Sequence, residues 1–152
     1  MKRIKSIGII LFAFLIISQF FSFASQVDEV AEVVQDLDSQ FLNKIVLCRN
    51  VQENEPVFQT NAFRTWDDKA VAWISFNYQS EEPFMLTWEW IDPTGRIYHV
   101  GEIEMDSGNY PDYRSWYWIS IWEHHAARLL GDWQVKVYID EHQVAFEEFS
   151  IE

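Results

Sequence analysis

Cysteine is almost absent from this sequence, since Cys48 is the only one. An internal disulfide is therefore impossible, and a small fold held together by disulfides is excluded. The thiol lies in the apolar run Ile45–Cys48, which predicts a small buried side chain. Pairing with a thiol of another chain remains the alternative for an exported protein.

Basic residues are also scarce, with 11 Lys and Arg against 24 Asp and Glu and a formal net charge of −13. Proteins bind nucleic acids and anionic lipid surfaces chiefly through Lys and Arg that meet phosphate groups. The charge therefore excludes nucleic acid as an expected partner, and it excludes a membrane surface beyond any leader segment.

Several catalytic patterns are missing as well. The chain has no Gly-x-Ser-x-Gly motif, and its strands do not alternate with helices as in a nucleotide-binding parallel sheet. Its adjacent carboxylates lie at expected turns and strand edges, where solvation explains them; they are Asp67-Asp68, Glu81-Glu82 and Glu147-Glu148. We therefore expect a protein that is not an enzyme and that carries no cofactor.

The first 24 residues have the layout of a secretory signal peptide. A basic start at residues 1–5 precedes the uncharged run Ile7–Ile17, and Ser22-Phe23-Ala24 supplies a small-x-small cleavage site. Cleavage after Ala24 predicts a secreted or periplasmic protein and lowers the net charge to about −16. An uncleaved membrane anchor is the alternative, because the apolar run reaches the short end of the ~17–25 residues that span a bilayer.

Residues 25–43 predict an acidic, amphipathic helical lead-in. Apolar side chains recur there at spacings of three and four, with Asp and Glu between them; they are Val27, Val30, Val34, Leu37 and Phe41. This stripe would pack on the following domain or on a partner.

From residue 44 to residue 152 the apolar pattern changes to a period of two, which is typical of β-strands. We expect strands at Lys44–Val51, Val57–Phe63, Ala70–Tyr78, Phe84–Ile91, Arg96–Met105, Arg114–Glu123, Gly131–Ile139 and Gln143–Ile151, with a polar loop over Asp106 to Asp112. Seven or eight short strands separated by turns predict an all-β, antiparallel β-sandwich. In the Gly131–Ile139 strand, Trp133, Val135, Val137 and Ile139 should face the core.

The closing run "GDWQVKVYID…FSI" resembles the last hairpin of bacterial exported immunoglobulin-like domains of unknown function. The run "WEWIDPTG", from Trp88 to Gly95, resembles their central hairpin. This resemblance implies an immunoglobulin-like sandwich and export, and it brings no catalytic residue. Those domains usually have Gly in the last turn, where this chain has Asp140-Glu141-His142, so a longer or differently shaped turn is expected.

Aromatic residues make up 17% of the chain, including eight Trp. Flat indole surfaces suit sugar rings or the apolar side chains of a partner. The candidates for an aromatic binding face are Trp73, Trp88, Trp90, Trp116, Trp118 and Trp122. The alternative is that these side chains are core, with the strand around Trp116 covered on both sides.

The run Glu123-His124-His125 is the only sequence that suggests a metal site, with His99 and His142 as further imidazoles. Adjacent side chains on a strand point to opposite faces, and the spacing matches no zinc motif. His124 and His125 are therefore weak metal candidates, and a solvated strand end is the favoured explanation.

These observations predict a non-catalytic, extracytoplasmic binding domain. Its partner would be an envelope or extracellular protein that meets an aromatic face or adds a strand to an open sheet edge. The alternatives are a carbohydrate-binding module that uses Trp and Tyr rings, and a metal-carrying protein or enzyme that uses His124 or His125.

Overall fold

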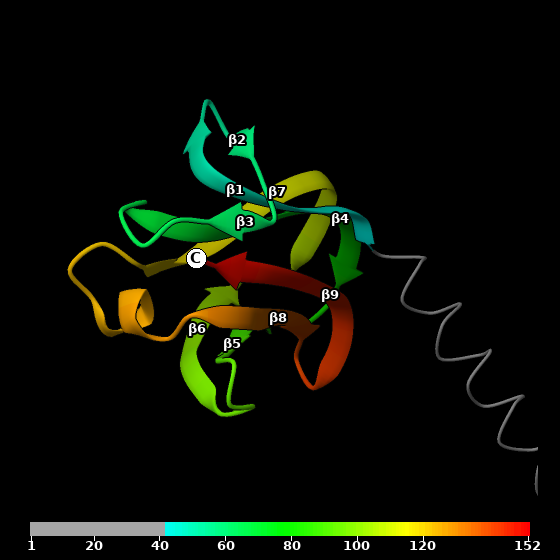
Figure 1. Ribbon diagram of the computed structural model, residues 1–152. Coiled ribbons are helices and arrows are strands. Elements are labelled where there is room, and N and C mark those ends of the chain that lie inside the picture. Colours follow the sequence, from blue (N-terminus) through cyan, green and yellow to red (C-terminus); the bar gives the residue numbers. More distant parts are fainter. Residues whose placement is uncertain (1–41) are drawn as a thin grey trace, which may run out of the picture. The chain divides into compact units, whose positions relative to one another are not determined.

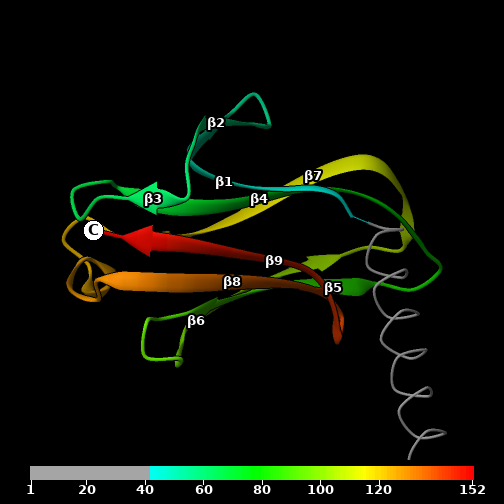
Figure 2. The same cartoon turned by 45° about the vertical axis from the view of Figure 1, so that its right-hand side comes forward.

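The computed structural model describes residues 42–152, which form nine β-strands in two sheets packed face to face (Figures 1 and 2). The predicted signal peptide and helical lead-in lie outside the described residues, except that residues 42 and 43 already belong to the first strand. Within residues 42–152, no helix is long and apolar enough to cross a membrane.

The strands divide into a four-stranded and a five-stranded sheet. Sheet A has the order β2 (Glu55–Gln59), β1 (Leu42–Gln52), β4 (Lys69–Ser80) and β7 (Gly108–Ser120). Sheet B has the order β3 (Ala62–Phe63), β9 (His142–Ile151), β8 (Gly131–Ile139), β5 (Phe84–Ile91) and β6 (Ile97–Met105). Every pair is antiparallel except β3 with β9, and the short 3-10 turn η1 (His125–Arg128) connects β7 to β8.

This strand order is that of an immunoglobulin-like sandwich. Strands β1, β4 and β7 take the places of strands A, B and E, while β9, β8 and β5 take those of G, F and C. Immunoglobulin domains carry a buried Trp on strand C, and β5 carries two, Trp88 and Trp90. The all-β, immunoglobulin-like sandwich implied by the sequence is therefore confirmed.

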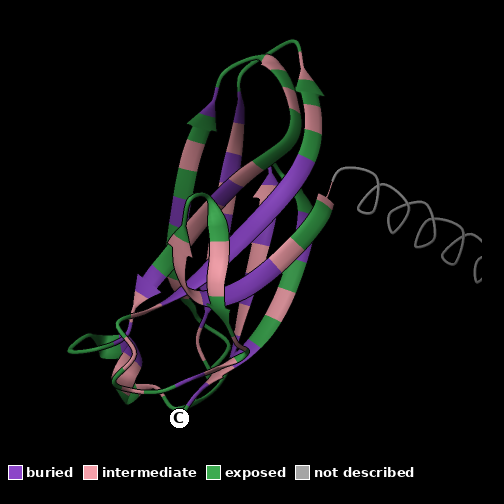
Figure 3. Ribbon diagram, turned by 90° about the horizontal axis from the view of Figure 1, so that it is seen from above, coloured by how far each residue is buried: buried purple, intermediate pink, exposed green. Residues whose placement is uncertain are grey.

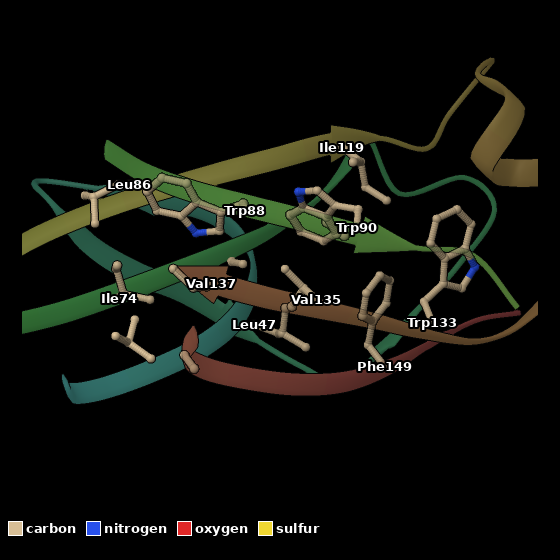
Figure 4. Close-up of a cluster of buried hydrophobic side chains, with 14 of the residues drawn as sticks. Leu47, Ile74, Leu86, Trp88, Trp90, Ile119, Trp133, Val135, Val137 and Phe149 are labelled. Carbon is tan, nitrogen blue, oxygen red and sulfur yellow. The ribbon is translucent and has the colours of Figure 1, made fainter. Parts of the chain in front are cut away.

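Buried and less buried residues alternate along β5 and β8, and the larger cluster of buried side chains lies between the sheets (Figures 3 and 4). The predicted inward face of β8 is confirmed, because Trp133, Val135, Val137 and Ile139 are all buried. Phe149 from β9 stacks on Trp133 and meets Trp90 edge-on, which joins the last hairpin to the centre of sheet B. Apolar burial of this kind is the main favourable contribution to folding.

The start of β8 is fixed by a side-chain hydrogen bond. The Trp133 indole Nε1 donates to the Leu129 backbone oxygen at 2.9 Å. In immunoglobulin domains a Tyr two residues before the second Cys makes the corresponding bond to upstream backbone. Trp133 occupies the position of that Tyr in this protein. Val135, two residues later, occupies the position of the second Cys, so an apolar side chain stands where immunoglobulin domains have a disulfide.

Two predicted segments differ from the observed ones in kind or in sheet. Most of the expected loop over Asp106 to Asp112 belongs to β7, because Gly108–Tyr110 pair with Tyr78–Ser80. The expected strand Val57–Phe63 is split into β2 and β3, which belong to different sheets. In both cases pairing with a distant strand outweighs the local polar or apolar character of the segment.

The last turn is tight although it lacks glycine. Asp140 adopts a positive φ of 52°, and β9 begins at His142. The Asp140 backbone N donates to the Met85 oxygen at 2.8 Å, and its carboxylate accepts from the Met85 N at 2.9 Å. These two bonds to β5 stabilise a backbone conformation that non-glycine residues seldom adopt.

The outer face of sheet A carries a small second core beneath the β1–β2 hairpin. Val46, Cys48, Val71 and Trp73 are buried there. The Trp73 indole Nε1 donates to the Asn54 oxygen in the hairpin turn at 2.9 Å, and Glu55 forms a salt bridge with Arg114 on β7 at 2.7 Å. The predicted burial of Cys48 is thus confirmed, and it results from the hairpin folding over its own sheet.

Candidate functional site

The six tryptophans expected to form one aromatic face lie in different environments. Trp88 and Trp90 are buried between the two sheets, so they are not part of an exposed face. Trp73 is buried beneath the β1–β2 hairpin, and Trp116 is half-buried against the same cluster. Only Trp118 and Trp122 are exposed.

Trp122 also lies outside the strand that was expected to carry it. Strand β7 ends at Ser120, and Trp122 follows in the loop toward η1. The Ile121 and Trp122 backbone N atoms donate to the oxygens of Asp68 and Asp67, at 2.9 and 3.0 Å. The segment after β7 is therefore tied to the β3–β4 loop.

A third exposed indole, Trp66, was not among the predicted residues. Its side chain is 65% exposed, compared with 51% for Trp122 and 45% for Trp118. These three residues, which we call the exposed tryptophan site, come from the β3–β4 loop, from the loop after β7 and from β7. The segments that carry them lie at one end of sheet A, because Lys69 at the start of β4 pairs with Ser120 at the end of β7 and the Trp122 N donates to the Asp67 oxygen.

The loop that carries Trp66 is held by Asp67. The Asp67 backbone N donates to the Arg64 oxygen, and the Asp67 carboxylate accepts from the Arg64 backbone N at 2.8 Å. The same carboxylate oxygen accepts from Arg49 Nε at 2.9 Å. Charge-assisted bonds of this kind are stronger than neutral ones, so Trp66 is exposed on an ordered turn.

Trp122 is held in a comparable way. The His124 backbone N donates to the Ile121 oxygen at 3.0 Å, which closes a turn around Trp122, and Glu123 within it has a φ of 63°. Ile121 is fully buried and anchors the turn in the core. The site thus presents two large apolar side chains from hydrogen-bonded turns, which lowers the entropy lost when a ligand orders them.

Trp118 is accompanied by a cation. It lies on the outer face of β7, opposite Val71, and Lys69 Nζ is 5.4 Å from the centre of its indole ring. This distance is within the range of a cation–π contact. Lys69 forms no salt bridge with any of the described residues, so its charge is available to a ligand.

The histidines considered as metal ligands are spread over the sandwich. His125 in η1 stacks on Tyr98, and His99 on β6 stacks on Tyr117. In residues 42–152 there is no group of three or more His, Cys, Asp or Glu side chains arranged to hold a metal ion, which includes the surroundings of His124 and His125.

Shifted pKa values occur away from the exposed tryptophan site. Burial raises the pKa of the Cys48 thiol, and desolvation raises the pKa of Glu147 on β9. A hydrogen bond from the Thr94 side chain lowers the pKa of Asp92 in the β5–β6 turn. These three groups lie on other strands or turns than Trp66, Trp118 and Trp122.

The comparisons with known proteins find likenesses in fold alone. No family model matches the chain, and no curated protein matches it. An immunoglobulin-like protein from Pseudomonas aeruginosa is 14% identical with a TM-score of 0.46, covering 74% of this chain and 95% of its own. An alkylpurine DNA glycosylase from Pseudomonas fluorescens is 9% identical with a TM-score of 0.42, covering 60% of this chain and 27% of its own. Neither likeness carries an argument about function.

Proposed function

We propose that this protein is a non-catalytic, extracytoplasmic binding domain whose exposed tryptophan site binds another protein of the cell envelope or the extracellular space. The observation that carries the proposal is the exposure of Trp66, Trp118 and Trp122 at one end of sheet A. Location outside the cytoplasm rests on the signal peptide expected in residues 1–24.

The cost of exposing these indoles supports a binding role. Four other tryptophans are buried, so the chain does bury indoles where its own fold needs them; they are Trp73, Trp88, Trp90 and Trp133. Large exposed aromatic side chains are enriched among the residues that dominate the binding energy of protein interfaces. The ordered turns around Trp66 and Trp122 would make such binding less costly in entropy.

Site-specific photo-crosslinking tests this proposal. A benzoylphenylalanine at position 118 should form adducts with one or a few proteins in cells that make this chain. Phe146 is the matched control, since it is an aromatic of similar exposure, 42%, on the outer face of sheet B. Equal adducts at positions 118 and 146, or none at position 118, would contradict a protein partner at this site.

A carbohydrate-binding module is the second candidate. The exposed carboxylate groups of Asp68 and Glu123 lie in the two loops that carry Trp66 and Trp122, and they could accept hydrogen bonds from sugar hydroxyls. Electrophoresis through gels that contain soluble glycans tests it. Retardation that is lost in Trp118→Ala but kept in Phe146→Ala would favour a glycan over a protein.

A further inference from the structure

The free edge of β7 differs from the other free strand edges of the sandwich. Natural sheets protect their edges with short strands, charges, prolines, bulges or inward-pointing charged residues. Strands β2 and β3 are short, β6 carries Glu102 and Glu104, and the uncovered part of β1 carries Lys44. On β9, Glu147 is paired with Val135 and so points toward the core side.

Strand β7 is protected over its first half only. Pro111 cannot donate a backbone hydrogen bond, and Asp112 has a φ of 46° where the register with β4 shifts. From Tyr113 to Ser120 the pairing with β4 is regular, and Ser115–Ser120 contains no charge, Pro or Gly. Among the described strands β7 pairs only with β4, so its other edge is a template for one more strand.

We infer that the edge of β7 over Ser115–Ser120 takes up an extended segment of another protein by strand addition. This inference rests on the proposed function, because the added strand would lie beside Trp116 and Trp118 on the outer face. Side chains of the added strand that face the same way would contact these indoles at every second position. The outer face therefore favours apolar residues at alternate positions of the bound segment.

The charged side chains at the two ends of Ser115–Ser120 indicate which residue the bound segment carries near Lys69. Lys69 pairs with Ser120 and has no ion-pair partner among the described residues, whereas Arg114 at the other end already bridges Glu55 and Asp112. An acidic residue of the added strand opposite Ser120 would therefore lie close to an unpaired lysine. The bound segment is an extended strand with apolar residues at alternate positions and an acidic residue at the end near Lys69.

A second copy of this chain fits the edge less well. With a two-fold axis through Tyr117, antiparallel pairing brings the second copy's Arg114, which is already bridged to Glu55 and Asp112, opposite Ser120, so no acidic side chain meets Lys69. The formal net charge of −13 also opposes self-association at low ionic strength.

Peptide selection tests both the position and the chemistry. Random 12-residue peptides displayed on phage would be selected on the purified protein, and the most enriched peptides synthesised. We expect alternating apolar residues with an acid at one end, and binding weakened about tenfold by Lys69→Glu. Lys136→Glu, which changes a lysine on the outer face of sheet B, is the matched control and should leave the affinity unchanged.

Amide hydrogen exchange separates strand addition from other binding. Within Ser115–Ser120, a bound strand should slow exchange at the alternate amides that face away from β4, while the amides bonded to β4 are protected already. Peptides that bind yet leave those amides unchanged would overturn strand addition while the proposed function stands. Protection of the same amides by the protein alone, in a dimer shown by light scattering, would overturn the inference in favour of a second copy.

Discussion

The position of the Glu147 carboxyl group has one unfavourable and one favourable consequence for the protein. It is paired with Val135 on the inward side of β9, and desolvation raises the pKa of its carboxyl group. An inward-pointing charge on a strand edge opposes pairing with a foreign strand. The raised pKa indicates that the charged form is disfavoured in the folded state, while the inward position of the side chain protects the uncovered part of β9.

The Glu147→Gln variant should be more stable than the natural protein at pH 7. The folded-state pKa is raised, so above it the folded protein carries a charge that is less well solvated than in the unfolded chain. This cost disappears as the pH falls through the folded pKa toward the unfolded value of about 4.3. Thermal midpoints should therefore differ at pH 7 and converge near pH 4.

Glu148→Gln is the matched control, since Glu148 is an exposed neighbour on the same strand. It should change the midpoint little at either pH. An unchanged midpoint for Glu147→Gln at pH 7 would mean that the Glu147 carboxylate is fully solvated.

The tryptophans show which side chains could be predicted from the sequence to be buried or exposed and which could not. In β8 a polar residue separates each apolar one, so the burial of Trp133 and Val135 could be predicted. Around Trp116 and Trp118 both faces of the strand are apolar, and alternation alone does not show which face another layer covers. Trp66 has no periodic neighbours at all, and its exposure follows from the turn held by Asp67.

Strands β6 and β7 are edge strands of different sheets, and the aromatic ring of Tyr117 on β7 reaches β6. The Tyr117 ring lies against Gly101 of β6 and stacks on Trp88 with ring centres 5.9 Å apart. A Cβ atom at position 101 would overlap the Tyr117 ring. Glycine is therefore required at this place in β6 to accommodate the Tyr117 ring.

Gly101→Ala should destabilise the protein by about 1–3 kcal/mol, the usual cost of overpacking a well-packed site. Urea unfolding would measure this loss. In the Tyr117→Ala background the added methyl group has room, so the same substitution should cost less there.

Gly108→Ala is the control, because a Cβ atom there would make ordinary contacts with Tyr110 at 3.5 Å. Equal costs for Gly101→Ala with and without the Tyr117 ring would contradict the proposed contact.

The strand bounds show which elements could be predicted from the sequence. Strands β5 and β8 begin and end at the predicted residues, since turn residues flank a clear alternation on both sides. The first part of β7 is polar and resembled a loop, and only its pairing with the end of β4 makes it a strand. The split between β2 and β3 likewise depends on which distant strand each short segment meets.

For the whole molecule, the division between exposed and buried indoles predicts two classes of tryptophan fluorescence. Acrylamide should quench Trp66, Trp118 and Trp122 strongly in the folded protein, the half-buried Trp116 weakly, and the four buried indoles only after unfolding. Replacing the three exposed residues by Phe should remove most of the quenching that is accessible in the folded state. A triple variant that is quenched as strongly as the natural protein would contradict the exposure described here.

The pairing of β3 with β9 bears on when the protein acquires its structure. These strands lie side by side in sheet B, and Arg64 beside β3 forms a salt bridge with Glu152 across 88 residues of sequence. Sheet B therefore stays incomplete on the ribosome until the segment that forms β9 has emerged. Contacts this distant in sequence also form slowly. Completion of sheet B is therefore expected to be a late step of folding, which suits the proposed export, because a translocation channel takes an unfolded chain.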